Sequence, residues 1–193
     1  MAGKQAKTLS NNDLNRILRR ARQGRYPERD RAMILLSVKA GLRACEIAGL
    51  TWAMLLDANG RLAPLIEIHD AISKRRRGRV IPLNRQLQGA LRELHEATSP
   101  DPCDPVIESE RDGHMCSMAV VNWFARLYRD CDLAGCSSHS GRRTFITNAA
   151  RVVHKVGGSL RDVQQLAGHA SISMTQRYIE GHSQAKRALV NLI

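Results

Sequence analysis

The residues best suited to covalent chemistry are a tyrosine and the histidines and arginine that precede it. Tyr178 is one of only three tyrosines in the chain, and it stands nine residues after His169 in the stretch LAGHASISMTQRYIEGH. Upstream, His139 and Arg142 form an H-x-x-R pair in SHSGRR. Because residues three apart on a helix are neighbours, these two side chains can face the same point.

Two further basic residues complete a set that fits the cleavage of a phosphodiester. Arg43 follows a Gly-Leu pair in GLRACEIAGL, at the expected start of a short helix, and Lys74 lies at the tip of an expected hairpin. Arginines can stabilise charge on phosphoryl oxygens, a tyrosine oxygen can attack as a nucleophile, and basic side chains can transfer protons. Each residue alone has an ordinary alternative role, as a surface charge, a helix cap or a half-buried ring. The chemistry depends on all of them meeting at one phosphate.

The acidic residues do not favour the other common route, in which metal ions held by carboxylates activate the phosphate. They are scattered, mostly beside arginines, and they form no D-x-D or E-x-x-H cluster. We therefore expect no metal ion at this site.

The overall charge indicates a polyanionic partner. Thirty Lys and Arg residues against eighteen Asp and Glu give a net charge of +12 and a pI near 10.3. Double-stranded DNA is the common partner of such a surface, and a solvated basic surface without a ligand is the alternative. Aromatic residues make up only 4% of the chain, which argues against a stacking platform for single strands. With no apolar run of roughly 18 residues and no secretory signal, a cytoplasmic, nucleoid-associated protein is expected.

Hydrophobic periodicity predicts a mainly α-helical domain with a small antiparallel sheet of about three strands, an α+β fold. Helices are expected over about 10–22, 27–40, 43–48, 84–97, 117–131, 141–153 and 160–167. The strands are expected within 52–83, with Asn59-Gly60 as one turn and the basic run 74–79 as another. Residues 1–9 are expected to form a basic tail, 10–182 the domain, and 183–193 a C-terminal helix.

Four stretches, in order, resemble the sequence boxes of the tyrosine recombinase family of phage integrases and Xer-type recombinases. GLRACEIAGLTW is similar to the first arginine box, and ISKRRRGRVIPL to the hairpin that carries the catalytic lysine. HSGRRTFITNAA resembles the H-x-L-R-H-T-F-A-T box, and LAGHASISMTQRYI resembles the L-G-H box that ends in the tyrosine. The resemblance runs from about Ser10 to Tyr178, essentially the whole catalytic domain of that family.

The resemblance implies a site-specific DNA recombinase, of the integrase or invertase type, that cleaves and rejoins strands through a 3′-phosphotyrosine. It implies that two arginines and a histidine bind the scissile phosphate, that another histidine accepts or positions the tyrosine proton, and that a lysine protonates the departing 5′ oxygen. Carried over box by box, the catalytic residues are Arg43, Lys74, His139, Arg142, His169 and Tyr178. Neither a metal nor a cofactor is implied.

A second group of basic residues is expected to bind the DNA backbone beside the cleavage point, the alternative being a solvated hairpin tip. This group comprises Arg75, Arg76, Arg77, Arg79 and Arg143. Three positions depart from the family pattern without removing a catalytic group. Gly141 and Ala167 stand where leucine is usual, and Arg143 stands where histidine is common. Gly141 is expected to loosen the helix entry, because glycine costs roughly 1 kcal/mol against alanine inside a helix.

The resemblance also implies self-association, as a tetramer on DNA. Family members usually carry an N-terminal DNA-binding domain, which is not expected in this sequence, so the chain is either a fragment or a short member similar to the fimbrial invertases. The helix over 183–193 either docks on a neighbouring protomer or folds back on its own domain. Two rival functions remain: a type IB topoisomerase with the same chemistry, and a DNA-binding regulator without catalysis.

Overall fold

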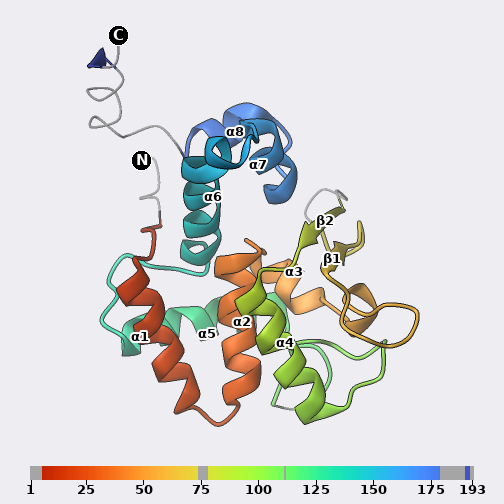
Figure 1. Cartoon of the computed structure of the whole chain (residues 1–193). Coiled ribbons are helices and arrows are strands. Elements are labelled where there is room, and N and C mark those ends of the chain that lie inside the picture. Colours follow the sequence, from red (N-terminus) through yellow and green to blue (C-terminus); the bar gives the residue numbers. More distant parts are fainter. Residues whose placement is uncertain (1–5, 74–77, 111, 179–189, 192–193) are drawn as a thin grey trace.

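The computed structural model describes residues 6–73, 78–110, 112–178 and 190–191, and it is mainly helical with one small antiparallel sheet (Figure 1). The predicted fold class is therefore confirmed. The α-helices are α1 (Asn11–Arg22), α2 (Pro27–Lys39), α3 (Ala44–Gly49), α4 (Arg85–Thr98), α5 (Ser117–Asp130), α6 (Ser140–Val152), α7 (Leu160–Ala167) and α8 (Ile172–Gln176). The other described elements are the 3₁₀ helices η1 (Trp52–Met54) and η2 (Val153–Val156) and the strands β1 (Leu65–Ile68) and β2 (Arg79–Pro82).

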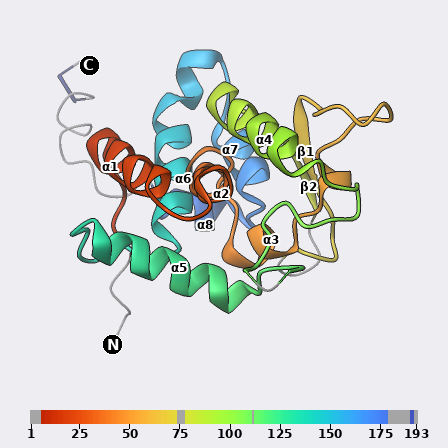
Figure 2. The ribbon, with the colours of Figure 1, turned by 90° about the horizontal axis from the view of Figure 1, so that it is seen from below.

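Helix α2 lies at the centre of the domain, with α1, α4 and α6 packed around it (Figure 2). Its middle is apolar on nearly every side, and Met33, Ile34, Leu35 and Leu36 are fully buried. A helix without a polar face has to be enclosed by other elements. Pro27 begins α2 at the first helical position, where the N–H that proline lacks would have no partner within the helix. This buried helix is the support against which α6 and the chain leading to α3 are placed.

The sheet holds two strands within the described residues, where the sequence predicts about three. β1 and β2 pair antiparallel with Ile66 opposite Ile81, and both side chains are buried in the core. The segment predicted to add a strand forms only a single bridge, between Leu56 and Leu62. The Asp57 carboxylate accepts two backbone hydrogen bonds from inside the intervening turn. The residues between Leu56 and Leu62 form this turn, so they are not free to extend the pairing into a strand. The predicted number of strands is therefore wrong for the described residues.

The helix ends follow the capping signals in the sequence. Ser10 caps α1 in a reciprocal capping box with Asp13, and Ser159 caps α7 in the same way with Asp162. Leu9, two residues before α1, is buried in the core, although the sequence places it in the N-terminal tail. Most of the predicted helix over 183–193 lies outside the described residues. Among the described residues, none of the helices is both long and apolar enough to cross a membrane.

Helix α6 leads from the main core to a smaller group of elements formed by η2, α7 and α8 (Figure 1). This group has an apolar cluster of its own, formed by the buried residues Ile146, Ala150, Val153, Val163 and Ala167. The partly buried ring of Tyr178 packs against the same cluster. The cluster therefore fixes where the chain after α8 presents the tyrosine.

The close packing of α6 on α2 depends on a glycine. A Cβ atom added at Gly141 would lie 2.2 Å from Ser37 Oγ and 2.9 Å from Ser37 Cβ. Any larger residue would therefore have to push the two helices apart or displace the serine. The expectation that Gly141 loosens the helix entry misses this role, because the glycine permits the contact that holds α6 beside α2.

Gly141→Ala is expected to lower the free energy of unfolding by about 1–3 kcal/mol, because the added methyl group overpacks the contact between α2 and α6. Gly89 in α4 offers a matched control, since a Cβ added there meets nothing within 4 Å. Gly89→Ala should raise the free energy of unfolding by about 0.5–1 kcal/mol through helix propensity. Urea titrations measure both effects. A Gly141→Ala chain as stable as the parent would show that the helices adjust without cost.

Candidate active site

Three arginines from different elements converge on the C-terminal end of α7. Each donates a hydrogen bond to one of three successive backbone carbonyl oxygens: Arg79 Nε to Leu166 at 2.9 Å, Arg142 Nη2 to Ala167 at 2.6 Å, and Arg43 Nη2 to Gly168 at 3.5 Å. Carbonyl groups at the end of a helix lack partners within it and carry the negative end of the helix dipole, so they attract cations. Gly168 ends the helix with a left-handed φ of 59°, which favours glycine.

Arg142 is deeply enclosed and bridges two segments of the chain. Besides its bond to the end of α7, its Nη1 donates to the Gly41 carbonyl oxygen at 2.6 Å. The residue is only 4% exposed. Burial, followed by the nearby charge of Arg43, lowers the pKa of Arg142 to about 9, so the guanidinium is still charged at neutral pH. A charged planar group fixed in this way suits paired hydrogen bonds to an anion.

Glu46 joins Arg43 and Arg79 through a second set of hydrogen bonds. Its fully buried carboxylate accepts hydrogen bonds from Arg79 Nη1 at 2.8 Å, Arg79 Nη2 at 2.9 Å and Arg43 Nη1 at 2.8 Å. Burial alone would raise the pKa of this carboxyl, but the hydrogen bonds and charges of the two arginines outweigh it and lower the pKa to about 2. Glu46 therefore stays ionised and fixes the directions of both guanidinium groups.

The Glu46 carboxylate is expected to stabilise the fold at neutral pH and to lose this effect in acid. Its folded-state pKa of about 2 lies below the ordinary value of 4.5, so the contribution is present above pH 4.5 and disappears as the pH falls toward 2. The shift corresponds to about 3 kcal/mol. Glu46→Gln removes the titration, so the free energy of unfolding should differ most between parent and variant at pH 7, and less at pH 3. An equal difference at both pH values would contradict the assignment.

His169 comes directly after the three carbonyl groups, and its ring lies against Tyr178. The ring centroids are 5.5 Å apart, with the planes 23° from parallel. The His169 carbonyl oxygen accepts a hydrogen bond from Gln164 Nε2 at 3.1 Å, which fastens the turn after α7. Burial, followed by the charges of the three arginines, lowers the pKa of His169 to about 4. The two residues that the sequence places nine positions apart thus meet beside the arginines.

Helix α6 carries two further predicted residues. His139 lies at the N-terminal end of the helix, one turn before Arg142, and is exposed. Arg143 follows Arg142 along the same helix and is partly buried. One helix therefore supplies a deeply held arginine and a histidine that solvent reaches.

The hairpin between β1 and β2 is described only at its base, where Asp70 Oδ1 accepts a hydrogen bond from the Gly78 backbone. Four predicted residues lie outside the described part of the chain: Lys74, Arg75, Arg76 and Arg77. The sequence groups Arg79 with these residues as an expected contact to the DNA backbone. In the structure, however, Arg79 points into the protein. Its side chain is only 6% exposed, and its guanidinium is engaged by Glu46 and the end of α7.

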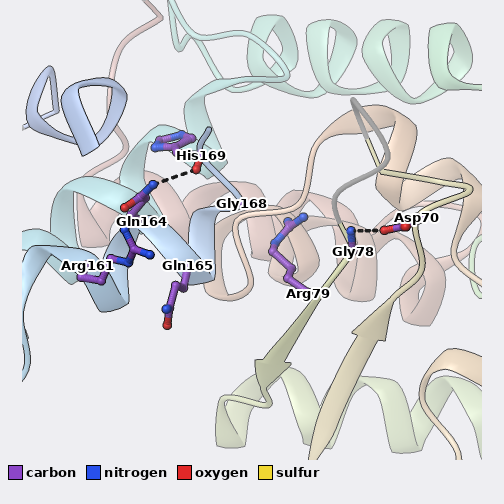
Figure 3. A pocket seen from close by; sticks show the side chains of 8 residues that line it. All are labelled: Asp70, Gly78, Arg79, Arg161, Gln164, Gln165, Gly168 and His169. Atoms are coloured by element: carbon purple, nitrogen blue, oxygen red, sulfur yellow. Dashed lines mark hydrogen bonds between the residues drawn. The ribbon is translucent and has the colours of Figure 1, made fainter. Parts of the chain in front are cut away.

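A hollow of about 430 Å³ opens beside these groups (Figure 3). One wall comes from α7 and the turn after it, the other from the base of the hairpin, and Arg79 lies between the two walls. Arg161, Gln164 and Gln165 line the α7 wall together with His169. Side chains that donate hydrogen bonds are the groups that hold phosphates and sugars in nucleic-acid complexes, so the hollow suits a phosphate-bearing ligand.

Most of the chain that carries this candidate site matches a known protein family. Residues 7–185 match the family model described as the phage integrase family. The chain belongs to the phage integrase family. Within the described residues of this family member, no three His, Cys, Asp or Glu side chains gather in a way that could hold a metal ion.

Curated proteins similar to this phage integrase family member include two called tyrosine recombinase XerC. The protein of Xylella fastidiosa (strain M23) is 32% identical over 151 residues, and that of Myxococcus xanthus is 29% identical over 163 residues. The alignments cover 78% and 79% of this chain but 48% and 50% of the relatives. The chain therefore spans about half the length of the curated relatives it matches.

Solved structures of two recombinases show the same fold. The crystal structure of XerA recombinase has a TM-score of 0.73 at 20% identity, covering 100% of this chain and 65% of that one. XerH recombinase in a post-cleavage complex with palindromic difH substrate has a TM-score of 0.75 at 19% identity, covering 98% and 53%. Because the sequence identities are only 20% and 19%, the comparison shows that the fold is shared and nothing further.

The structure adds residues to the candidate site that the sequence boxes alone did not single out. Glu46 stands three residues after Arg43, and that spacing on a short helix is the signal that could have found it. Arg161 and Gln165 are four residues apart, so helical periodicity places them on one face of α7. Periodicity could not show that this face borders the hollow, because the facing hairpin is distant in sequence.

Proposed function

We propose that this domain is the catalytic part of a site-specific DNA recombinase, which cleaves and rejoins DNA strands through a 3′-phosphotyrosine. The observation that carries the proposal is the convergence at the end of α7, where Arg43 and Arg142 bond adjacent carbonyl oxygens and His169 packs on Tyr178. A phosphate bound by the two arginines would lie beside the tyrosine. The similarity to proteins called tyrosine recombinase supports the same chemistry.

Substrate binding rests on the arginines. Arg43 and Arg142 would bind the two non-bridging oxygens of the scissile phosphate, because a planar and permanently charged guanidinium meets phosphate with paired hydrogen bonds. His169 would donate a further hydrogen bond to the same phosphate. These donors are already held by the surrounding backbone, so little reorganisation is needed when charge grows on the phosphoryl oxygens.

In the cleavage step, the Tyr178 oxygen attacks phosphorus while the bond from phosphorus to the 5′ oxygen breaks. His139 would take the phenolic proton, and Lys74 would give a proton to the departing oxygen. The products are a 3′-phosphotyrosine and a free 5′ hydroxyl. Because the covalent link conserves the phosphodiester, a second 5′ hydroxyl can attack it and rejoin or exchange strands without ATP.

Double-stranded DNA is the proposed partner, consistent with a net charge of +12. Arg75, Arg76, Arg77 and Arg143 are proposed to contact its backbone, whereas Arg79 is proposed to act from within the site. The proposed active assembly is a tetramer of this protein on DNA. Association with the nucleoid follows from the proposed substrate.

Nicked duplexes taken from the sequence that flanks the coding region test the proposal. A nick close to the cleavage position lets the released fragment diffuse away, so that the protein–DNA link cannot be resealed. We expect a complex that survives SDS and whose DNA-bound peptide contains Tyr178 by mass spectrometry. Binding without any adduct would instead support a non-catalytic regulator. Relaxation of a supercoiled plasmid that lacks these sequences would point to a type IB topoisomerase.

A further inference from the structure

Thr175 makes a hydrogen bond unlike those of Thr98 and Thr144, two other threonines in the helices. Its side chain is fully buried on α8, and Oγ1 lies 2.9 Å from His169 Nδ1. The hydroxyls of Thr98 and Thr144 instead donate to the backbone carbonyl oxygen four residues earlier, at 2.9 and 2.8 Å. Within the described residues, the structure gives the Thr175 hydroxyl no hydrogen-bond partner besides His169.

A buried hydroxyl has a single hydrogen, and leaving it without an acceptor is unfavourable. For Thr175 the acceptor at hand is the lone pair on His169 Nδ1, so this nitrogen carries no proton. A neutral imidazole then has its proton on Nε2, the ring nitrogen on the other side. We infer that Thr175 is a positioning residue, which fixes His169 in the Nε2–H form so that this N–H can donate to a phosphate oxygen.

The charges around His169 make the choice of tautomer decisive. Burial and the three arginines keep its pKa low, at about 4, so the ring is neutral near pH 7 and has one N–H to offer. If the ring instead carried its proton on Nδ1, the lone pair on Nε2 would face the phosphate. Two hydrogen-bond acceptors, Nε2 and a phosphate oxygen, would then face each other. The Thr175 backbone also helps to place Tyr178, whose N–H donates to the Thr175 carbonyl oxygen at 3.0 Å.

The tautomer can be measured on the DNA-free protein by nitrogen-15 NMR of histidine-labelled chain, with the His169 signals identified by their loss in His169→Gln. The parent should show an unprotonated Nδ1 and a protonated Nε2. Thr175→Val, of the same shape but without the hydroxyl, should give averaged shifts from a mixture of tautomers. Thr175→Ser should restore the parent pattern. A proton on Nδ1 in the parent, or an unchanged pattern in the valine variant, would overturn the inference.

The consequence for DNA rests on the proposed function and is measured separately. Cleavage of the nicked duplex by Thr175→Val should slow roughly tenfold, by analogy with the loss of a partner that orients a metal-bound histidine. Thr175→Ser should recover most of the rate. Circular dichroism establishes that the valine variant is folded. A slowed valine variant that keeps the parent tautomer would refute the positioning role. If neither the parent nor any variant forms an adduct, the proposed function is wrong. The NMR measurement still decides the tautomer independently, because it uses the DNA-free protein.

Discussion

A Tyr178→Phe chain is expected to form no covalent adduct with DNA while it binds the same duplexes as tightly as the parent. The substitution removes the attacking oxygen but keeps the ring, which packs on His169 and on the apolar cluster formed by α6, η2 and α7. Fold and phosphate binding should therefore persist. The measurement is the SDS-resistant adduct on a nicked duplex, together with a binding titration and a thermal melt.

Tyr128→Phe is the matched control for the loss of a phenolic oxygen. Tyr128 is buried on α5, and its hydroxyl has no hydrogen-bond partner within the described residues. Burial raises the pKa of this phenol above its ordinary value, which makes it a poor nucleophile at neutral pH. Adduct formation should stay at the parent level in this control. An adduct that persists in Tyr178→Phe would show that another side chain attacks the phosphate.

Arg142→Lys is expected to slow cleavage by about 10²- to 10³-fold, the range found when a fixed hydrogen-bond donor is removed from a developing charge. The charge is kept, but a lysine ammonium cannot reproduce the planar fork that reaches Gly41 on one side and Ala167 on the other. The loss should be seen in single-turnover rates at saturating DNA, because the donor is most important when charge grows on the phosphate.

Arg143→Lys, one residue along the same helix, provides the comparison for Arg142→Lys. Arg143 is only partly buried, and a single backbone phosphate contact needs charge rather than a fork. Its cleavage rate should stay within about threefold of the parent, since an unspecific phosphate contact affects binding more than chemistry. Equal losses for both lysine variants would argue that Arg142 acts only through its charge.

Much of the candidate site could be predicted because its signals are local. The Gly168 helix end, the His169 that follows it and the spacing to Tyr178 all lie in one short stretch. The departure at Ala167 also has a physical explanation in the structure. That position contributes its backbone carbonyl oxygen to Arg142, and a carbonyl oxygen is supplied by any residue, so replacing the usual leucine need not disturb the bond.

The rest of the site depends on contacts between distant parts of the chain. Arg79 is expected from sequence to face DNA because it ends a run of exposed-looking arginines. In the structure it is the first residue of β2 and turns toward Glu46, which lies 33 residues earlier. Nothing in the basic run marks that partner. The packing of Gly141 against Ser37 is hidden for the same reason, since the two helices meet only in the folded chain.

Without DNA, the end of α7 holds like charges close together in a poorly hydrated part of the fold. Backbone carbonyl groups orient the three guanidinium groups but cancel none of their formal charge, and Glu46 cancels only one of the three. A phosphodiester brings one negative charge, and attack by a tyrosine oxygen adds another, so the electrostatic match improves as the reaction proceeds. If DNA is the partner, as proposed, it should also stabilise the fold, because a ligand that binds the folded state alone raises the free energy of unfolding.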